Sequence, residues 1–473
     1  MTEFDVAIIG AGPGGYVAAI RAAQQGACVC IVERDKVGGT CLNRGCIPTK
    51  ALFSSANLLK RMRTSQIHGI RVEGLELDFA QTDQRKNEVV AKLVGGVEQL
   101  LKANGVDIFH GHASLEGPGK IRIQSEGVIG HIRARKVILA SGSLAARPKA
   151  LPIDGKNVLT SSEILAIKEL PESLLVIGGG YIGCEFAGIF SVFGTRVTII
   201  EQLPTILAQS DRQVVREVEK AFKEQGVDIR TGTSVENLEV TDGSVTATLS
   251  GGETVTAEKA LVAVGRVPNT EGLGLAEAGV KMEKGAVVVD DHMQTSVDGI
   301  YAIGDVTNII QLAHVASYQA DIAVTNALGG DARADYRVVP STIFTLPEIG
   351  HVGLTEEDCK KRELEVEIGR FSYQASSKAL CDGEPQGLVK IVAEKDGGKI
   401  LGASIVGEEA STLVAEVAVA MRREMSAAEL GRVIHSHPTL PEMVKEAAED
   451  TEGAAIHKMG RKRGGGGSAS RRG

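Results

Sequence analysis

The chain has 473 residues, of which 43% are apolar and 24% are charged, and its formal net charge is −8. This length suggests three or four domains, and the negative charge argues against nucleic acid or an anionic membrane surface as a main partner. No apolar run approaches the roughly 20 residues of a membrane-spanning helix. An apolar strand over Phe4 to Ile9 leaves no room for a signal peptide. Seven cysteines in so long a chain do not form a disulfide framework, so we expect a cytoplasmic protein.

The first motif is a predicted strand, glycine turn, helix and second strand. Gly10, Gly12 and Gly15 form the turn, and the second strand, Val29 to Val32, ends in Glu33. The first glycine permits a tight turn, the second lets a pyrophosphate approach the backbone, and the third lets the helix pack on the strand. The carboxylate would accept hydrogen bonds from ribose hydroxyls. The pattern predicts a dinucleotide site.

A cysteine pair follows almost at once. Cys41 and Cys46 have four residues between them, and Gly38–Gly39 before them allows a close backbone approach. A purely structural disulfide is unusual in a reducing compartment, and a metal site would need further ligands nearby, whereas none follows until His68. We therefore predict a redox-active disulfide. Pro48 deprives a helical turn of a donor and predicts a distortion just past Cys46.

The same motif occurs a second time. Gly178, Gly180 and Gly183 form the turn, and the strand Arg196 to Ile200 ends in Glu201. In both copies the acidic residue lies 23 positions after the first glycine (33 − 10 and 201 − 178). A single motif of this kind is a weak signal, and two glycine-rich turns without a ligand are the alternative. Two complete copies in the expected order indicate two dinucleotides.

The cysteine pair decides which cofactor each copy binds. A flavin can exchange electrons with a disulfide, and the pair follows Glu33, so FAD is predicted in the first copy and a nicotinamide nucleotide in the second. Residues 202–207 contain no Arg or Lys that could pair with a 2′-phosphate, and the carboxylate of Glu201 would repel one. NAD is therefore favoured over NADP.

These residues resemble the flavin disulfide reductases, and most closely the dihydrolipoamide dehydrogenases, from about Phe4 to about Arg463. Residues 263–269, 295–305 and 435–442 carry further motifs of that family. The resemblance implies an α/β fold with two Rossmann-like dinucleotide-binding domains plus a C-terminal α+β dimerisation domain, as in glutathione reductase. It also implies a homodimer.

The expected domains follow from the motifs and the resemblance, and the last of them should contain the strands Leu388 to Val392 and Ile400 to Val406. They are an FAD-binding domain (1–147), an NAD-binding domain (148–270), a central FAD-contacting domain (271–338), a dimerisation domain (339–463) and a flexible basic tail (464–473).

The resemblance also implies a reaction. Cys41 would meet the substrate, Cys46 would face the flavin, and His437, oriented by Glu442, would be the acid–base catalyst serving the disulfide of the other subunit. A histidine titrates near neutrality and a carboxylate fixes its tautomer, which suits removal of a thiol proton. The enzyme would oxidise dihydrolipoamide to lipoamide and reduce NAD. Its partner would be the lipoyl domain of a 2-oxo acid dehydrogenase complex or the glycine cleavage carrier protein.

Further residues are implied in cofactor binding, and no metal is predicted. Lys50 would lie near the flavin and pair with Glu185. The remaining FAD residues are Gly10, Gly12, Gly15, Glu33, Arg34, Thr40, Ala113, Ser141, Gly142, Ser143, Asp305, Leu312, Ala313 and His314. The nicotinamide residues are Gly178, Gly180, Tyr181, Ile182, Gly183, Glu201, Gly265 and Arg266.

Two alternatives remain open at this point. A related disulfide or metal reductase would need a cationic pocket beyond Glu201 for NADP, or a C-terminal cysteine pair, whereas the last cysteine is Cys381. A non-catalytic flavoprotein subunit would not need Cys41, Cys46 and His437. Arg44 lies between the two cysteines, where an added cation could lower a thiol pKa or could equally point into solvent. The other cysteines are predicted to be small buried apolar side chains; they are Cys28, Cys30, Cys184, Cys359 and Cys381.

Overall fold

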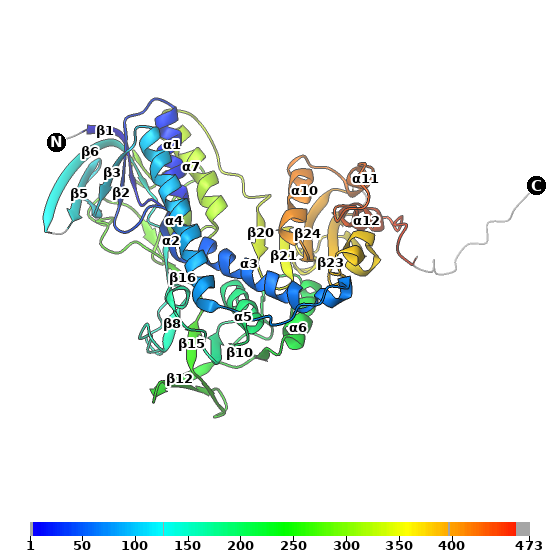
Figure 1. The fold of residues 1–473 in the computed structure, drawn as a ribbon. Helices are drawn as coiled ribbons and strands as arrows, with labels where there is room; N and C mark the ends of the chain where they lie inside the picture. Colours follow the sequence, from blue (N-terminus) through cyan, green and yellow to red (C-terminus); the bar gives the residue numbers. More distant parts are fainter. Residues whose placement is uncertain (1–2, 126, 396–397, 460–473) are drawn as a thin grey trace, which may run out of the picture. The chain divides into compact units, whose positions relative to one another are not determined.

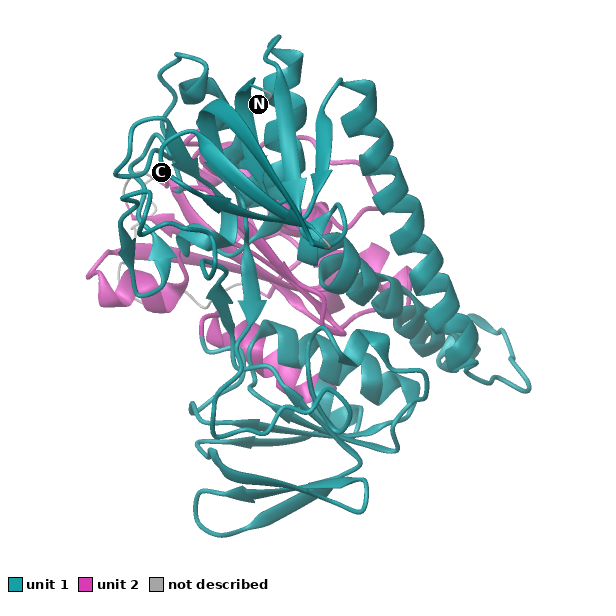
Figure 2. Cartoon of the chain, turned by 90° about the vertical axis from the view of Figure 1, so that its left-hand side faces the viewer, with its two compact units in different colours: residues 1–208, 222–336 teal, residues 209–221, 337–473 magenta. Residues whose placement is uncertain are grey.

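The computed structural model describes residues 3–125, 127–395 and 398–459, and the chain forms two compact units (Figure 2). The first unit holds residues 1–208 and 222–336, and the second holds residues 209–221 and 337–473. The polypeptide thus leaves the first unit after Ala208 and returns to it at Phe222. The predicted basic tail, residues 464–473, lies outside the described residues. The four-domain division made from the sequence stays a prediction.

The first sheet of the first unit carries the amino-terminal glycine motif. Its strands are β1 (Glu3–Ile9), β2 (Val29–Glu33), β3 (Asp107–His110), β4 (His112–Leu115), β5 (Lys120–Ser125), β6 (Val128–Leu139) and β19 (Ile300–Ala302). The order is β3-β2-β1-β6-β5-β4 with β19 beside β6, and β1 pairs in parallel with both β2 and β6. The interiors of β1 and β2 are apolar and buried, as expected for parallel strands covered on both faces.

The second sheet carries the second glycine motif. Its strands are β8 (Val158–Thr160), β9 (Ser173–Ile177), β10 (Arg196–Glu201), β11 (Asp228–Thr231) and β15 (Lys259–Val262). They pair in parallel in the order β11-β10-β9-β15-β8. Smaller sheets join β12 (Val235–Thr241), β13 (Ser244–Leu249) and β14 (Thr254–Ala257), β7 (Ser143–Ala145) with β16 (Arg266–Pro268), and β17 (Met282–Glu283) with β18 (Ala286–Val287).

Helices cover these sheets (Figure 1). In the first unit they are α1 (Pro13–Gln24), α2 (Gly39–Arg44), α3 (Cys46–Arg63), α4 (Phe79–Ala103), α5 (Tyr181–Phe193) and α7 (Ala313–Ala327), with short 3₁₀ turns η1 (Ser65–His68), η2 (Ile164–Ala166) and η3 (Gly304–Thr307). α1 packs against α7, and Ala18, Ala19, Ala320 and Ala323 supply small buried side chains to this core. No helix among the described residues is long and apolar enough to cross a membrane.

The second unit is an antiparallel sheet with helices. Its strands are β20 (Pro340–Ile343), β21 (Glu348–Gly353), β22 (Val366–Ser372), β23 (Leu388–Glu394) and β24 (Ile400–Gly407), in the order β20-β21-β24-β23-β22. Its helices are α8 (Glu356–Lys361), α9 (Ser377–Cys381), α10 (Ala410–Arg422), α11 (Ala427–Gly431) and α12 (Glu442–Asp450), with the turn η4 (Tyr373–Ala375). Most of α6 (Arg212–Glu224) also belongs to this unit.

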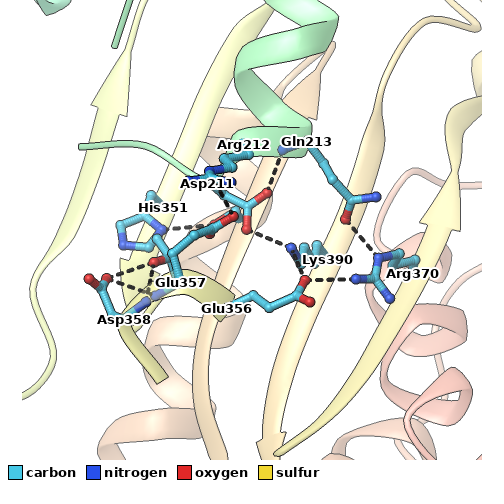
Figure 3. Close-up of polar contacts among 11 residues, drawn as sticks. Asp211, Arg212, Gln213, His351, Glu356, Glu357, Asp358, Arg370 and Lys390 are labelled. Atoms are coloured by element: carbon cyan, nitrogen blue, oxygen red, sulfur yellow. Dashed lines mark hydrogen bonds and ion pairs between the residues drawn. The ribbon is translucent and has the colours of Figure 1, made fainter. Parts of the chain in front are cut away.

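A buried ion-pair network crosses the sheet of the second unit (Figure 3). Nζ of Lys390 on β23 lies 2.6 Å from Asp211, just before α6, and 2.6 Å from Glu356 on α8. The side chains of Lys390 and Asp211 are 1% and 0% exposed. Arg370 on β22 donates to Glu356 and to Gln213, each at 2.7 Å. The network therefore ties residues 211–213 to the sheet through one charge pair, Lys390 with Asp211, that has almost no access to water.

The predicted fold class is confirmed, and the strand predictions hold to within two residues at each end. One local prediction is wrong. The helix break lies at Gly45, before Cys46, and Pro48 lies in the first turn of α3. A proline is tolerated there because the first helical N–H groups have no partner within the helix in any case.

The prediction that the other cysteines are buried holds for three of the five. Cys30, Cys184 and Cys359 are buried, whereas Cys28 and Cys381 are exposed. Cys28 lies just before β2, and Cys381 is the last residue of the short helix α9.

Candidate functional site

The two glycine motifs fold in the same way. In the first, Glu33 accepts hydrogen bonds from the N–H of Ala11 at 2.7 Å and from that of Asp35 at 2.9 Å. In the second, Glu201 accepts them from the N–H of Gly179 at 2.6 Å and from that of Leu203 at 2.7 Å. Each carboxylate is thereby fixed at the carboxyl end of its strand, where a ribose would lie.

The glycines within each motif are needed for different structural reasons. A β-carbon on Gly15 would overlap the carbonyl oxygen of Gly10, and one on Gly183 would overlap that of Gly178, so these positions need glycine for the fold itself. A β-carbon on Gly180 would meet no atom of the protein within 4 Å. The bare surface there, at the start of α5, fits a pyrophosphate approaching a helix N-terminus. Gly12 is nearly as open, with Cα of Gly39 at 4.0 Å.

A second glycine pair brings the cysteines to the first motif. Gly38 and Gly39 have φ of 93° and 57°, a backbone conformation that favours glycine. A β-carbon on Gly39 would lie only 2.6 Å from Cα of Gly12. The absence of a side chain at Gly39 therefore lets α2, with Thr40 and Cys41, begin directly beside the turn that would hold the first dinucleotide.

The two thiols are adjacent and chemically unequal. Both cysteines are free thiols in this structure. A hydrogen bond from Cys41, helped by the charge of Lys50, lowers the pKa of Cys46 to about 7. The same hydrogen bond, together with burial, raises the pKa of Cys41 well above its ordinary value. Cys46 is thus the more acidic thiol of the pair, and Cys41 is the one that more readily keeps its proton.

Lys50 and Glu185 lie next to this pair. Nζ of Lys50 lies 2.9 and 3.0 Å from the two carboxylate oxygens of Glu185, whose side chain is 8% exposed. The predicted pairing of Lys50 with Glu185 is therefore present. Burial raises the pKa of Tyr181, which also responds to Arg266, Asp305 and Glu185. The phenol of Tyr181 therefore lies among the groups that the sequence assigned to both nucleotides.

Arg44 has an identifiable partner. Its guanidinium forms an ion pair with Asp35, and both side chains are 45% exposed. Burial raises the pKa of Glu33, and the charge of Arg44 is one of the groups that oppose this rise. Arg44 is not among the groups that shift the pKa of either thiol. The prediction that Arg44 could lower a thiol pKa is therefore not supported.

The remaining residues assigned to FAD lie around the first sheet. Ala113 is buried on β4, Asp305 lies in η3, and Leu312, Ala313 and His314 begin α7. Arg34 follows β2, and Oγ of Ser141 donates to the carbonyl of Asn269 at 2.8 Å. The nicotinamide residues Tyr181 and Ile182 open α5, and Gly265 and Arg266 follow β15. The binding roles of these residues stay predictions.

His437 and Glu442 form a pair in the second unit. Nδ1 of His437 donates to Glu442 at 3.0 Å, and the N–H of Thr439 donates to the same carboxylate at 2.9 Å. Burial by itself would raise the pKa of Glu442. The hydrogen bonds from Thr439 and His437 outweigh burial and hold this pKa below its ordinary value. The side chain of His437 is 72% exposed, and its Nε2 bonds to no residue that the structure describes. That nitrogen is available to take a proton.

Sequence reasoning missed two neighbours of the predicted site residues. Nε2 of His435 lies 2.7 Å from Glu416 on α10, and the side chain of His435 is 6% exposed. Tyr16, directly after Gly15, has a pKa raised by burial and then by the charge of Cys41. Tyr16 could have been found from the sequence, because it lies directly beside the glycine motif. Nothing in the sequence links Glu416 to His435. The described residues contain no group of three or more His, Cys, Asp or Glu that could hold a metal ion.

Comparisons with known proteins identify the family to which the chain belongs. The family profile described as pyridine nucleotide-disulphide oxidoreductase matches residues 4–320, and the profile of its dimerisation domain matches residues 339–448. The chain is 42% identical to a dihydrolipoyl dehydrogenase of Bacillus subtilis over 96% of this chain and 99% of that protein. It is 41% identical to the dihydrolipoyl dehydrogenase of Thermus scotoductus, over 98% and 100% of the two chains.

Solved structures with the same fold include two with different names. LpdA from Mycobacterium tuberculosis superimposes with a TM-score of 0.89 at 27% identity, covering 95% of this chain and 99% of that one. The Cu(II) complex of the HOCl-induced flavoprotein disulfide reductase RclA from Escherichia coli superimposes with a TM-score of 0.87 at 29% identity, with the same coverage.

Proposed function

Since this chain is a member of the pyridine nucleotide-disulphide oxidoreductase family, we propose that it oxidises a protein-bound dihydrolipoyl group to the disulfide and reduces NAD. The family consists of flavoproteins that bind FAD and a pyridine nucleotide, and it acts through a redox disulfide. The identity of the substrate as a lipoyl group is what we propose beyond the chemistry of the family. Full-length relatives that are 42% and 41% identical and named dihydrolipoyl dehydrogenase support it.

The unequal thiol pair is the observation that carries the proposal. A dithiol substrate can reduce Cys41–Cys46 by two successive exchanges, each of which needs a thiolate to attack and a thiolate to leave. Cys46, with its pKa lowered to about 7, is the better leaving group. The first substrate thiolate therefore attacks Cys41, breaks the Cys41–Cys46 bond and releases Cys46 as a thiolate beside Lys50. The second substrate thiolate then attacks the sulfur bound to Cys41 and closes the substrate disulfide.

His437 is the proton acceptor in this reaction. Its Nε2 takes a proton from a substrate thiol, and Glu442 stabilises the resulting imidazolium through Nδ1. Cys41 leaves as the second thiolate and is reprotonated, which matches its strongly raised pKa. FAD, bound along the first glycine motif, would accept the electron pair of the dithiol and pass it to the nicotinamide ring. In the homodimer that the dimerisation domain supports, we expect His437 to serve the disulfide of the other chain.

The nucleotide is proposed to be NAD. Glu201 has both carboxylate oxygens held by backbone N–H groups, so its charge is fixed where a 2′-phosphate would lie. Residues 202–207 offer no Arg or Lys to neutralise that phosphate. A cytoplasmic location and a lipoyl partner, from a 2-oxo acid dehydrogenase complex or the glycine cleavage system, complete the proposal.

Substrate oxidation by the purified holoprotein is the direct test. We expect NAD-dependent oxidation of dihydrolipoamide and of a reduced lipoyl domain, and no such activity in Cys41→Ser. Co-purification with a lipoylated protein would identify the carrier. Absence of dihydrolipoamide oxidation in a flavin-loaded, dimeric preparation would contradict the proposal.

The second candidate is a related disulfide or metal reductase. The similarity to RclA, of which a Cu(II) complex is among the solved structures, favours it. The lack of a metal-ligand cluster among the described residues gives no support to a dedicated metal site. NADH-dependent reduction of Cu(II) or of small disulfides, at a kcat/KM above that for lipoamide, would establish this second function instead.

A further inference from the structure

Two equivalent chain segments meet beside the glycine motifs of the first unit. A β-carbon on Gly10 would overlap the carbonyl of Ala140, and one on Gly178 would overlap that of Ala263. The chain continues from Ala140 into β7 and from Ala263 into β16, and these two strands pair antiparallel, with Ser143 opposite Pro268. Each of the paired strands thus leads directly away from one glycine turn.

A single hydroxyl, that of Ser143 on β7, connects Arg266 on β16 with Asp305 in η3. Oγ of Ser143 donates to Oδ2 of Asp305 at 2.5 Å and accepts from Nε of Arg266 at 2.8 Å. Nη2 of Arg266 also donates to the carbonyl of Ser143 at 2.8 Å. Nε of Arg266 and Oδ2 of Asp305 lie 3.9 Å apart, with the hydroxyl bridging them. Ser143 is 4% exposed, so water cannot readily replace it.

Both charged groups keep an atom for a ligand. Among the described residues, nothing hydrogen-bonds to Oδ1 of Asp305 or to Nη1 of Arg266. Their side chains are 23% and 11% exposed. The charges of Arg266 and Asp305 both act on the phenol of Tyr181 at the start of α5, so the bridge lies close to the nicotinamide site as well as to η3.

We propose that Ser143 is a positioning residue for both nucleotides, because its hydroxyl holds the carboxylate of Asp305 toward FAD and the guanidinium of Arg266 toward the nicotinamide nucleotide. Ser143 was predicted from the sequence as an FAD-binding residue; here it acts through Asp305 and Arg266. The proposal rests on the two nucleotide sites of the proposed function and is independent of the lipoyl substrate.

Ser143→Ala removes the bridge and leaves a smaller side chain. Losing a hydrogen bond to a charged group should raise the dissociation constant for FAD roughly ten- to a hundred-fold, measured by titrating FAD-free protein with FAD. The KM for NAD of FAD-saturated enzyme should rise as well. Ser143→Thr, which keeps the hydroxyl, should restore most of the affinity for FAD.

A double-mutant cycle separates positioning from general stability. If Ser143 acts through Asp305, the variant with both Ser143→Ala and Asp305→Asn should bind FAD no more weakly than Asp305→Asn alone. Ser404→Ala is a matched control, since Ser404 is 3% exposed and its hydroxyl bonds to His351 in the second unit. That variant should keep the affinity for FAD.

Two results would overturn the proposal. One is additive weakening of FAD binding in the Ser143→Ala, Asp305→Asn cycle. The other is a loss of thermal stability in FAD-free Ser143→Ala as large as that in the FAD-bound protein, since the hydroxyl would then serve only the fold. FAD titration needs no substrate, so a failure of the lipoamide assay would leave this test unaffected.

Discussion

Cys46 is the acidic thiol because of its neighbours rather than its exposure. The hydrogen bond from Cys41 is the largest contribution to its lowered pKa, ahead of the charge of Lys50. We therefore expect Cys41→Ala to raise the pKa of Cys46 from about 7 toward the ordinary value of 9.0, whereas Cys41→Ser keeps a hydroxyl donor and should change it less.

The long-wavelength absorbance of a thiolate beside oxidised flavin measures this pKa in a pH titration. The two variants should contain equal amounts of flavin, which serves as the control. Identical midpoints in Cys41→Ala and Cys41→Ser would show that the hydrogen bond does not determine the pKa of Cys46.

Glu201 should determine the choice of nucleotide. A fixed carboxylate that gains ribose hydrogen bonds and repels a phosphate should be worth about 2–4 kcal/mol, or tens- to hundreds-fold in kcat/KM for NAD over NADP. Glu201→Gln keeps the size of the side chain but removes its charge, so this variant should narrow the preference mainly by improving NADP. Equal kcat/KM for the two nucleotides in the unmodified protein would refute the assignment.

His437 should be needed only for thiol chemistry. His437→Gln removes the proton acceptor and should lower lipoamide turnover by roughly 10²–10⁴-fold. Reduction of an artificial acceptor by NADH through FAD does not pass through the dithiol, so that activity should be largely kept. Glu442→Gln should be milder, because the imidazole remains. A parallel loss of both activities in His437→Gln would indicate damage to the fold instead.

At the scale of elements, the second glycine motif contains one glycine that we expect to be needed for NAD binding and another that we expect to be needed for folding. Gly180 has a φ of −74° and an added β-carbon would meet no protein atom, so Gly180→Ala should keep the melting temperature but raise the KM for NAD. Gly183→Ala would force a methyl group onto the carbonyl of Gly178 and should lower the melting temperature. If Gly180→Ala leaves the KM unchanged, the pyrophosphate does not approach that turn.

The elements that could be predicted are those with local signals. Apolar runs ending in Glu33 and Glu201, each preceded by a glycine turn, located the parallel strands of both sheets. The break at Gly45 was placed wrongly, since Pro48 looked like the interruption although the first turn of a helix accepts it. The bonds of Ser143 to Asp305 and Arg266 depend on the pairing of β7 with β16, across more than 120 residues of sequence. No local sequence pattern predicts such a pairing of strands.

At the scale of the whole molecule, the match to the dimerisation domain supports a homodimer. If each site combines the disulfide of one chain with His437 of the other, neither Cys41→Ser nor His437→Gln homodimers oxidise dihydrolipoamide well. Mixed dimers of the two variants should recover one working site of two, measured as turnover after verified subunit exchange. The separate variants, treated in the same way, are the control. No recovery would place both groups in the same chain.

The resemblance of the motifs predicted the family and the fold class of the whole chain, and both are confirmed. The return of residues 209–221 to the second unit was not predicted. The segment is held there in part by a charge pair 179 residues apart in sequence, Asp211 with Lys390. Neither residue stands in a sequence pattern that distinguishes it from an ordinary surface charge.

This charge pair has a consequence for the order of events during synthesis. Asp211 is synthesised 179 residues before Lys390. At 5–20 residues per second, the segment around Asp211 therefore remains without its counter-charge for about ten to forty seconds. The early segment cannot reach its final place until the carboxyl-terminal sheet exists. Conversely, a fragment that begins at residue 337 would lack Asp211, the fully buried partner of Lys390, and would leave the ammonium group with Glu356 alone. The last unit to be translated is therefore the one that completes the folding of a helix made much earlier.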